Sequence, residues 1–504
     1  MSTADTPASD PSATHPATSD PSADPAASDP ATTDPSAAAT ATGAVDAPAP
    51  KKRLILNLFE MNCVGHITHG LWRLPHNHRS EYKDLAYWLE LARLAERGGF
   101  DAIFLADVLG AYDVFGDSPA PALLEGIQAP NGDPMMVVPA MAAVTEHLGF
   151  GITFSTSYEP PFAFARRMST LDHLTGGRVG WNVVTSYLPN AARNFGLDAE
   201  IPKAERYARA AEYLDVLYKL WEGSWEDDAV VADPTADGLA PGSGVYTDPS
   251  KVHAIDHVGE HFRVAGPHLS EPSPQRTPVL FLATASPKGV EQAARNAEVV
   301  FTGGPAVKAV GAATREAAVL AGRSADDVSF IVQAGVVTGE TDEVVADKLA
   351  LYRSFASEQG KLVHRSIPFD APSHPRDRSV REALEAEGRL DHPGAAALPL
   401  DITVGQLIDS VDEAWGGTFF VAGTPTVVAD EIERWLDDEG IDGINLRQYH
   451  SFDTLTDFVE LVVPELRRRG RLREAYVPGE TLRERLTGGG PRLPGTHPAA
   501  AYRR

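Results

Sequence analysis

Two kinds of segment alternate along this sequence from Arg53 onward, and this alternation constrains the fold more than any other feature. One kind is a short run of apolar and β-branched residues, and the other is longer and carries apolar residues at helical spacing. Near-continuous apolar strands separated by helices are typical of parallel strands that are buried on both faces. Eight such units predict a (β/α)8 TIM barrel. Because a plain barrel needs only about 250 residues, this chain is expected to carry insertions.

The predicted elements follow one another in strict order. Strands are expected at 54–62, 100–107, 149–157, 178–186, 278–284, 299–303, 328–337 and 443–449. Helices are expected at 80–97, 134–147, 160–174, 203–221, 287–297, 306–321, 341–357 and 453–469, with a further one at 425–439. Insertions rich in Gly, Pro and polar residues are expected near 110–133, 187–202, 223–277 and 358–422. Long loops in a compact domain are usually functional, so 223–277 or 358–422 is expected to form a lid.

Residues 1–50 differ in composition from the rest of the chain. They are nearly all Ala, Ser, Thr, Asp and Pro, and they include no Lys, Arg or aromatic residue. Such a segment predicts a disordered tail, and it lacks the basic and apolar regions of a signal peptide. We expect a cytoplasmic protein. The barrel is expected over 51–476, and 477–504 is expected to be a C-terminal extension that packs on the barrel or on a partner subunit.

Charge and motifs exclude several classes of protein. A formal net charge of −26 argues against binding to nucleic acid or to an anionic membrane surface. The single cysteine excludes a disulfide framework and a Cys-based metal site. No apolar run approaches the ~18–20 residues that span a bilayer. The chain also lacks a G-x-G-x-x-G after a strand, a P-loop, H-E-x-x-H and G-x-S-x-G.

Hydroxyl and amide side chains gather where the predicted strands end, which is the face of a barrel that carries its chemistry. Neutral groups of this kind suit a polar organic cofactor better than a divalent metal, which prefers carboxylates or histidines. Ser286 precedes a helix and stands beside Lys288, so it is either part of a phosphate site or an ordinary N-cap. Asp107 and Asn182 are either cofactor-binding groups or loop caps.

Histidines and the one cysteine follow the first strand. Cys63 and His66 form either a thiolate–imidazole pair or a small buried thiol beside a pocket-lining histidine. His76 and His78 have the spacing of a two-histidine metal site, but they follow Pro75 on a predicted loop. No metal site is therefore expected.

Longer stretches of the sequence resemble one known family. They are NLFEMNCVGHITHGLWRLP, FDAIFLADVLGAYD, ITFSTSYEPPFAFARRMSTLDHLTGGRVGWNVVTSY, ERYARAAEYLDVLYKLWEGSWEDDA, ATASPKG and FVAGTPTVVADEIERWL. They are similar to the FMN-dependent monooxygenase group that contains nitrilotriacetate monooxygenase component A, dibenzothiophene-sulfone monooxygenase, a pristinamycin synthase subunit and a long-chain alkane monooxygenase. This group belongs to the bacterial-luciferase-like superfamily. The resemblance covers roughly residues 53–500.

The resemblance implies an oxidoreductase that takes reduced FMN (FMNH2) from a separate NAD(P)H:flavin reductase. With O2 as co-substrate it would oxygenate a small organic substrate through a C4a-(hydro)peroxyflavin, as a homodimer or homotetramer. The cofactor-binding residues that the resemblance implies are Asp107, Thr156, Asn182 and Ser186 about the ring and ribityl chain, and Tyr207 and Ser286 at the phosphate. The catalytic residues that it implies are Cys63, His66 and Tyr112. Ser186 stands where the alkane-oxidising relative has His, so no proton-handling role is carried over to it.

Three alternatives remain open from the sequence. The first is a deazaflavin (F420)-dependent oxidoreductase of the same superfamily. The second is a metal-dependent barrel hydrolase that uses His66, His76 and His78. The third is a non-catalytic flavin-binding subunit. For the monooxygenase, His66 is expected to protonate the flavin peroxide, because an unperturbed imidazole has a pKa of about 6.5.

Overall fold

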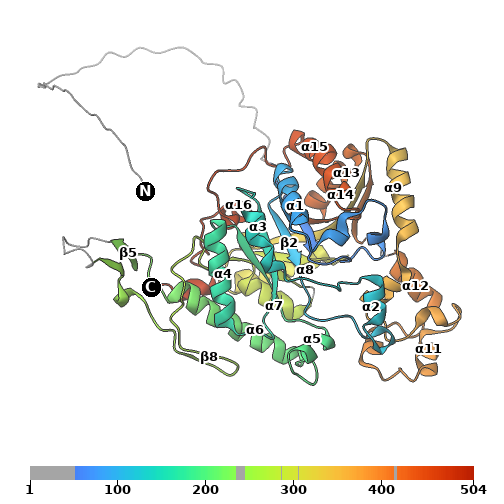
Figure 1. Cartoon of the computed structure of the whole chain (residues 1–504), viewed down its shortest axis with the longest axis horizontal. Coiled ribbons are helices and arrows are strands. Elements are labelled where there is room, and N and C mark those ends of the chain that lie inside the picture. Colours follow the sequence, from blue (N-terminus) through green and yellow to red (C-terminus); the bar gives the residue numbers. More distant parts are fainter. Residues whose placement is uncertain (1–50, 234–243, 285, 305, 414–416) are drawn as a thin grey trace, which may run out of the picture. The chain divides into compact units, whose positions relative to one another are not determined.

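A closed barrel of parallel strands forms the centre of the protein (Figure 1). The computed structural model describes residues 51–233, 244–284, 286–304, 306–413 and 417–504, so the predicted tail at 1–50 lies outside the described residues. The barrel strands, in the order in which they pair, are β1 (Ile55–Met61), β2 (Ala102–Ala106), β3 (Gly149–Ser155), β4 (Val179–Val184), β9 (Val279–Ala283), β10 (Val299–Thr302), β11 (Ser329–Thr338) and β13 (Gly443–Arg447). The pairing of β13 with β1 closes the ring. The predicted (β/α)8 fold is confirmed.

Side chains alternate between the inside and the outside of the barrel, as the period of a strand requires. In β1, Leu56 and Leu58 belong to the large apolar cluster shared with the surrounding helices. Ile55 and Phe59 belong to a separate cluster inside the ring, together with Phe104 of β2. Two-sided burial explains why the strands are almost continuously apolar in the sequence.

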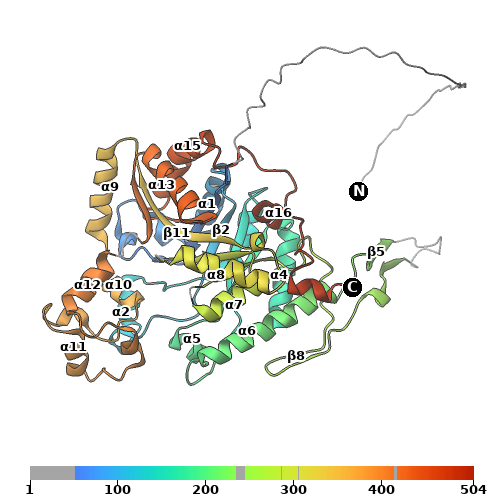
Figure 2. The same cartoon turned by 180° about the vertical axis from the view of Figure 1, so that it is seen from behind.

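Helices surround the strands in both views of the molecule (Figures 1 and 2). The main ones are α1 (Leu85–Arg97), α4 (Pro161–Thr175), α6 (Lys203–Tyr218), α7 (Pro287–Asn296), α8 (Val307–Leu320), α9 (Asp342–Phe355), α13 (Pro425–Asp438), α14 (Asp453–Asp457) and α15 (Val463–Arg468). The helix expected at 134–147 is much shorter, because α3 spans only Val138–Ala142. The guanidinium of Arg178 donates hydrogen bonds to the carbonyls of Ala142 and Thr145, and the Glu96 carboxylate accepts from the backbone N–H of Glu146, so these two side chains take the place of helical hydrogen bonds.

The insertion at 358–422 contains more regular structure than its composition predicted. It holds α10 (Glu358–His364), α11 (Val380–Ala386), α12 (Val404–Glu413) and most of β12 (Phe419–Gly423), a strand that was not predicted. The first half of β11 pairs with β10 and its second half pairs with β12. The long strand β11 therefore continues past the end of β10 and supports the insertion at the barrel mouth.

Three of the four insertions pack together into one small apolar cluster, which we call the mouth cluster. It joins residues of 110–133, which include α2 (Ala120–Glu125), and residues of 187–202, which include α5 (Pro189–Asn194), to residues of 358–422. In both views α2, α11 and α12 lie beside one another (Figures 1 and 2). The insertion at 223–277 instead forms two short antiparallel hairpins, β5 (Val230–Asp233) with β6 (Val245–Thr247) and β7 (His257–Val258) with β8 (Arg263–Val264).

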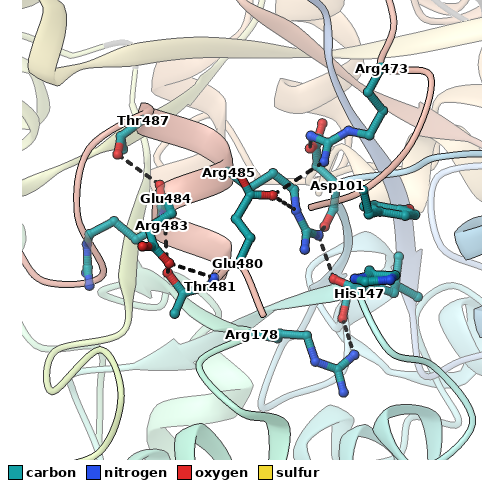
Figure 3. Close-up of polar contacts among 12 residues, drawn as sticks. Asp101, His147, Arg178, Arg473, Glu480, Thr481, Arg483, Glu484, Arg485 and Thr487 are labelled. Carbon is teal, nitrogen blue, oxygen red and sulfur yellow. Dashed lines mark hydrogen bonds and ion pairs between the residues drawn. The ribbon is translucent and has the colours of Figure 1, made fainter. Parts of the chain in front are cut away.

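The C-terminal segment closes the opposite end of the barrel. Leu482 and Leu486 of α16 (Leu482–Thr487) join the cluster inside the ring. Arg483 donates to both carboxylate oxygens of buried Glu298, at 2.6 and 3.0 Å. Arg485 reaches the carbonyls of Asp101 and His147, at 3.2 and 2.6 Å (Figure 3). These contacts lie where the barrel strands begin, so they leave the other end as the mouth. No helix among the described residues is long and apolar enough to cross a membrane.

Candidate active site

Cavities open at the mouth, where the strands end. The first, of about 450 Å³, lies among β4, β9 and α6 and includes Tyr207 and Gly289 in its lining. The second, of about 360 Å³, shares Asp107–Leu109 with the first. The third, of about 840 Å³, is lined by Gln333 of β11, by Arg447 at the end of β13 and by the insertion at 358–422. Among the described residues, 223–277 contributes nothing to the lining of these three cavities, so 358–422 is the better candidate lid.

Asp107 follows β2 and stands between the first two cavities. Its carboxylate accepts a hydrogen bond of 2.9 Å from the side-chain amide of Asn131. Burial raises the pKa of Asp107 from 3.8 to about 7, and the hydrogen bond from Asn131 only partly opposes that effect. A carboxyl group with a strongly raised pKa in a cavity is a typical functional group, because folding alone gains nothing from burying it there.

The amide and hydroxyl residues at the ends of β3 and β4 are held against one another. Asn182 donates to the hydroxyl of Thr153 at 2.9 Å, while its own Oδ1 is buried without a hydrogen-bond partner among the described residues. Ser186 donates to the hydroxyl of Ser155 at 2.7 Å and has a φ of 55°. Thr156 is fully buried and pairs with the backbone of β4, so its hydroxyl faces the protein and not a cavity in this structure.

Ser286 contacts Tyr207, which lines the 450 Å³ cavity. The Tyr207 hydroxyl lies 3.5 Å from Ser286 Oγ, and that oxygen also accepts from the backbone N–H of Gly289 at 3.2 Å. Ser286 is thus the N-cap of α7 and faces Tyr207 at the same time, so the two interpretations of this serine are compatible. Lys288 pairs with Glu291 on the surface, at 2.8 Å. Arg206, which the sequence did not single out, lines the cavity and donates to the carbonyl of Ser186.

Cys63 is a buried thiol. Burial raises its pKa to about 12, despite the opposing effect of the nearby Arg79 guanidinium. The thiolate that a thiolate–imidazole pair requires is therefore not formed near neutral pH. Of the two interpretations of Cys63, the structure supports the small buried thiol.

His66 is neutral in this structure, contrary to the expected role as a proton donor with an ordinary pKa. Burial lowers the pKa of His66 well below 6.5, and the positive charge of Arg79 lowers it further. The ring packs edge-on against Phe59, with 4.7 Å between the ring centroids. An imidazolium is therefore not available at this position near pH 7, although a neutral imidazole can still donate one hydrogen bond.

Tyr112 leads into a set of polar residues that the sequence did not bring together. Its hydroxyl contacts the hydroxyl of Tyr187 and donates to Gln128 Oε1 at 3.2 Å. Gln128 in turn contacts His364, and His364 contacts His69 at 2.8 Å. His364 lies in an insertion without a recognisable motif, so no sequence signal pointed to it. It reaches the mouth only because the mouth cluster folds 358–422 against 110–133.

The histidines proposed for a metal-dependent hydrolase do not converge. His66 packs against Phe59, whereas His78 contacts Glu81 at 2.9 Å and His76 is exposed on a loop. Across the described ranges, no group of three His, Cys, Asp or Glu side chains is arranged to hold a metal ion. The geometry therefore gives no support to that alternative.

The residues at the mouth fit a flat, polar, anionic cofactor. A volume of 450 Å³ lies within the usual range of about 300–1,000 Å³ for small-molecule sites. Apolar side chains such as Leu214 and Leu282 line this cavity together with the Tyr207 ring. The Oδ1 of Asn182 has no hydrogen-bond partner among the described residues and can therefore accept a hydrogen bond, as can the buried amides of Asn57 and Asn445. A flavin mononucleotide has both features, because its ring carries N–H donors and its ribityl chain carries a phosphate that could contact Ser286.

Sequence comparisons identify proteins of one kind over almost the whole chain. A long-chain alkane monooxygenase of Geobacillus thermodenitrificans is 48% identical over 90% of this chain and 98% of its own length. A dimethyl-sulfide monooxygenase of Hyphomicrobium sulfonivorans is 45% identical over 90% and 94%. Nitrilotriacetate monooxygenase component A of Aminobacter aminovorans is 35% identical over 86% and 96%.

Solved structures agree with the sequence comparisons. The crystal structure of a long-chain alkane monooxygenase superimposes with a TM-score of 0.81 at 47% identity, over 90% of this chain and all of that one. A riboflavin lyase solved with a modified FMN and riboflavin superimposes with a TM-score of 0.80 at 35% identity, over the same shares. Residues 68–443 match the family model described as luciferase-like monooxygenase. This chain therefore belongs to the luciferase-like monooxygenase family.

Proposed function

We propose that this chain is the oxygenase component of a two-component flavin monooxygenase. It would take FMNH2 from a separate NAD(P)H:flavin reductase and use O2 to oxygenate a small organic substrate. When bound, reduced FMN would supply the two electrons that activate O2. The observation that carries the proposal is the convergence of Ser286, Tyr207 and the Gly289 N–H beside the 450 Å³ cavity, which Tyr207 and Gly289 line.

The proposed phosphate end has three kinds of donor. The two hydroxyls lie 3.5 Å apart, close enough for one phosphate oxygen to contact both. The N-terminus of α7 adds backbone N–H groups and the positive end of its dipole, both of which favour an anion. Lys203 and Arg206 line the same cavity and can attract an anion, although Arg206 also lies 3.5 Å from the carboxylate of Glu200.

The ring end would lie beside Asp107 and the ends of β3 and β4. Asn182 Oδ1 lacks a donor, and the Asp107 carboxyl can accept a hydrogen bond when ionised or donate one when protonated. Because the pKa of Asp107 is about 7, both its protonated and its ionised form are present in neutral solution. We propose that Asp107 and Asn182 bind ring N–H groups, and that Ser186 and Thr156 support the ribityl side.

The mouth cluster would exclude water from the reaction. It places Tyr112, His364 and their polar partners over the site, on segments that share one apolar core. Excluding water prevents the hydrolysis of reactive intermediates and strengthens hydrogen bonds inside the site. Cys63, His66 and Tyr112 remain our proposed residues of the reaction face, with His66 acting as a neutral hydrogen-bond donor.

The relatives support a system with a separate partner component and a flavin. One relative is named as component A of nitrilotriacetate monooxygenase, and subunits A and B of pristinamycin IIA synthase both match this chain. The riboflavin lyase, which is 35% identical, was solved with a modified FMN. We further propose a cytoplasmic homodimer or homotetramer.

Anaerobic binding of FMNH2 tests the cofactor site. Ser286→Ala and Tyr207→Phe each remove a donor to the phosphate. A hydrogen bond to a charged group contributes about 1.5–3 kcal/mol, so each change is expected to raise the Kd roughly 10- to 150-fold. Ser379→Ala is the matched control, because Ser379 is an N-cap on α11 and does not line the cavities.

Incorporation of oxygen tests the reaction. The chain, a flavin reductase and 18O2 would be incubated with an n-alkane, dimethyl sulfide or nitrilotriacetate, and products would be analysed by mass spectrometry. We expect label in the product of at least one substrate, and only when FMNH2 is supplied. Failure to bind FMNH2 at micromolar concentrations would overturn the proposal. Hydride transfer from reduced F420 in its place would favour the deazaflavin alternative.

A further inference from the structure

Five polar side chains form a continuous hydrogen-bonded chain across the barrel mouth. Tyr187 contacts Tyr112, Tyr112 contacts Gln128, Gln128 contacts His364, and His364 contacts His69. The two ends reach different cavities, because Tyr187 lines the 450 Å³ cavity and His69 lines the 840 Å³ cavity. We call these five residues the mouth chain. Its residues come from three insertions and from the loop after β1. The mouth chain is therefore formed by tertiary packing and not by hydrogen bonding within one segment.

The middle of the mouth chain is an amide, which has a direction. One end of the Gln128 side chain can only accept a hydrogen bond and the other can only donate. Tyr112 lies 3.2 Å from Oε1, and His364 Nε2 lies 3.3 Å from Nε2 of Gln128. Gln128 is buried and held at a φ of 51°, a backbone conformation that non-glycine residues adopt rarely and often at functional sites.

With the amide in this orientation, every hydrogen in the mouth chain points the same way. Tyr112 donates to Gln128, so its oxygen accepts from Tyr187. Gln128 donates to Nε2 of His364, so His364 carries its hydrogen on Nδ1 and donates it to Nε2 of His69, at 2.8 Å. His69 then carries its own hydrogen on Nδ1. In this arrangement Tyr187 presents only lone pairs to the cavity.

Turning the amide over reverses every bond without leaving any group unpaired. Gln128 then donates to Tyr112, Tyr112 donates to Tyr187, and both histidines carry their hydrogen on Nε2. Tyr187 keeps its own hydrogen and can donate it into the cavity. Both histidines are free to take either form because burial keeps them neutral: it lowers the pKa of His364 to about 4 and that of His69 well below 6.5. Mixed arrangements leave two hydrogens or two lone pairs facing each other, which is penalised at the buried Tyr112 and Gln128.

We propose that Gln128, His364 and His69 are positioning residues that set, through one turn of the Gln128 amide, whether Tyr187 donates or accepts a hydrogen bond at the 450 Å³ cavity. Tyr187 is accordingly a further site residue that exchanges hydrogen bonds with whatever occupies this cavity. A ligand at His69 in the 840 Å³ cavity would favour one arrangement and so influence Tyr187. The proposal goes beyond the monooxygenase assignment and holds whether or not the cavity takes FMN.

Two substitutions force the mouth chain in opposite directions. Tyr187→Phe removes the acceptor that Tyr112 needs in the reversed arrangement, so both histidines are expected to carry hydrogen on Nδ1. Gln128→Glu offers only acceptors, so both are expected to carry it on Nε2, measured at pH 9, where we expect His364 to be neutral beside the new carboxylate. Tyr246→Phe, on the exposed strand β6, is the control and is expected to leave the wild-type signals unchanged.

Histidine ring 15N NMR of the full-length, ligand-free chain reports the tautomers directly. The signals of His69 and His364 are assigned by their loss in His69→Gln and His364→Gln. Opposite tautomers in the two test variants, shared by both histidines in each, would support the proposal. The same tautomer in both variants, or different tautomers at His69 and His364 in one protein, would overturn it. If Gln128→Glu does not fold, Gln128→Leu must abolish the effect of Tyr187→Phe on the histidine signals. Because no flavin is present, the result is independent of the FMN-binding test.

Discussion

Replacing Asp107 with Asn should make the ligand-free protein more stable while damaging its site. Asn keeps the shape of the side chain and can still accept the hydrogen bond from Asn131, but it removes the buried charge. The pKa of Asp107 rises from 3.8 to about 7 on folding, mainly because burial disfavours the ionised form. At about 1.4 kcal/mol per pKa unit, ionised Asp107 costs the fold at most about 4 kcal/mol.

The sign of the pH dependence follows from linkage. A carboxyl group whose pKa is raised on folding favours the folded state below its unfolded pKa, and this advantage is lost as the pH rises through the folded value. The wild-type protein should therefore lose stability between about pH 4 and pH 7 at this site, and Asp107→Asn should not. At pH 8 the variant should be more stable by up to about 4 kcal/mol, and at pH 4 the two should be nearly equal.

Urea denaturation at pH 4, 6 and 8 measures this difference. Asp117→Asn is the control, because the hydrogen bond from Arg389 lowers the pKa of that exposed carboxyl and its removal should bring no gain at pH 8. Equal midpoints for wild type and Asp107→Asn at pH 8 would refute the reasoning, as would a difference that does not change with pH. A stabilised variant that also binds FMNH2 more weakly would show that the charge is kept for function.

Three further results are expected. Arg483→Met should destabilise the protein by about 3–5 kcal/mol, because it leaves Glu298 charged and buried. Arg468→Met, which removes an exposed ion pair, should leave the midpoint in urea almost unchanged, because solvent screens such a pair; similar losses for both variants would contradict the argument. Iodoacetamide at pH 8 should leave Cys63 unmodified in the folded chain and alkylate it after unfolding, as measured by mass spectrometry, because its pKa is about 12. The His66 ring signal, assigned with His66→Gln, should not titrate between pH 6 and pH 8 because its pKa is well below 6.5, and a midpoint near 6.5 would be incompatible with the burial described.

The barrel was predictable because each strand is buried on both sides. β1 reads as ILNLFEM, in which five of the seven residues are apolar, and the helix that follows it has one apolar face. Patterns of this kind depend on neighbouring residues only. The short length of α3 was not predictable, because the side chains that bond to the backbone at its end, Arg178 and Glu96, lie more than thirty residues away in the chain.

The candidate site was predictable only in part for a related reason. Asp107 and Ser286 follow predicted strands, so the barrel rule locates them at the mouth. His364 and Gln128 lie in insertions, and they meet only because residues 236 positions apart pack into one cluster. The prediction that His66 has an ordinary pKa was wrong for a different reason. The pKa of His66 depends on burial and on Arg79, and the spacing of residues in the sequence reveals neither.

The helix α16 has a consequence for how the protein is made. A ribosome releases residues 482–487 only after all the barrel strands have emerged, yet Arg485 bonds to Asp101, 384 positions earlier. Until then, at the end of the barrel where the strands begin, Leu482 and Leu486 are not yet in place to keep water from the apolar interior. A nascent chain arrested before this helix should therefore expose hydrophobic surface and attract chaperones.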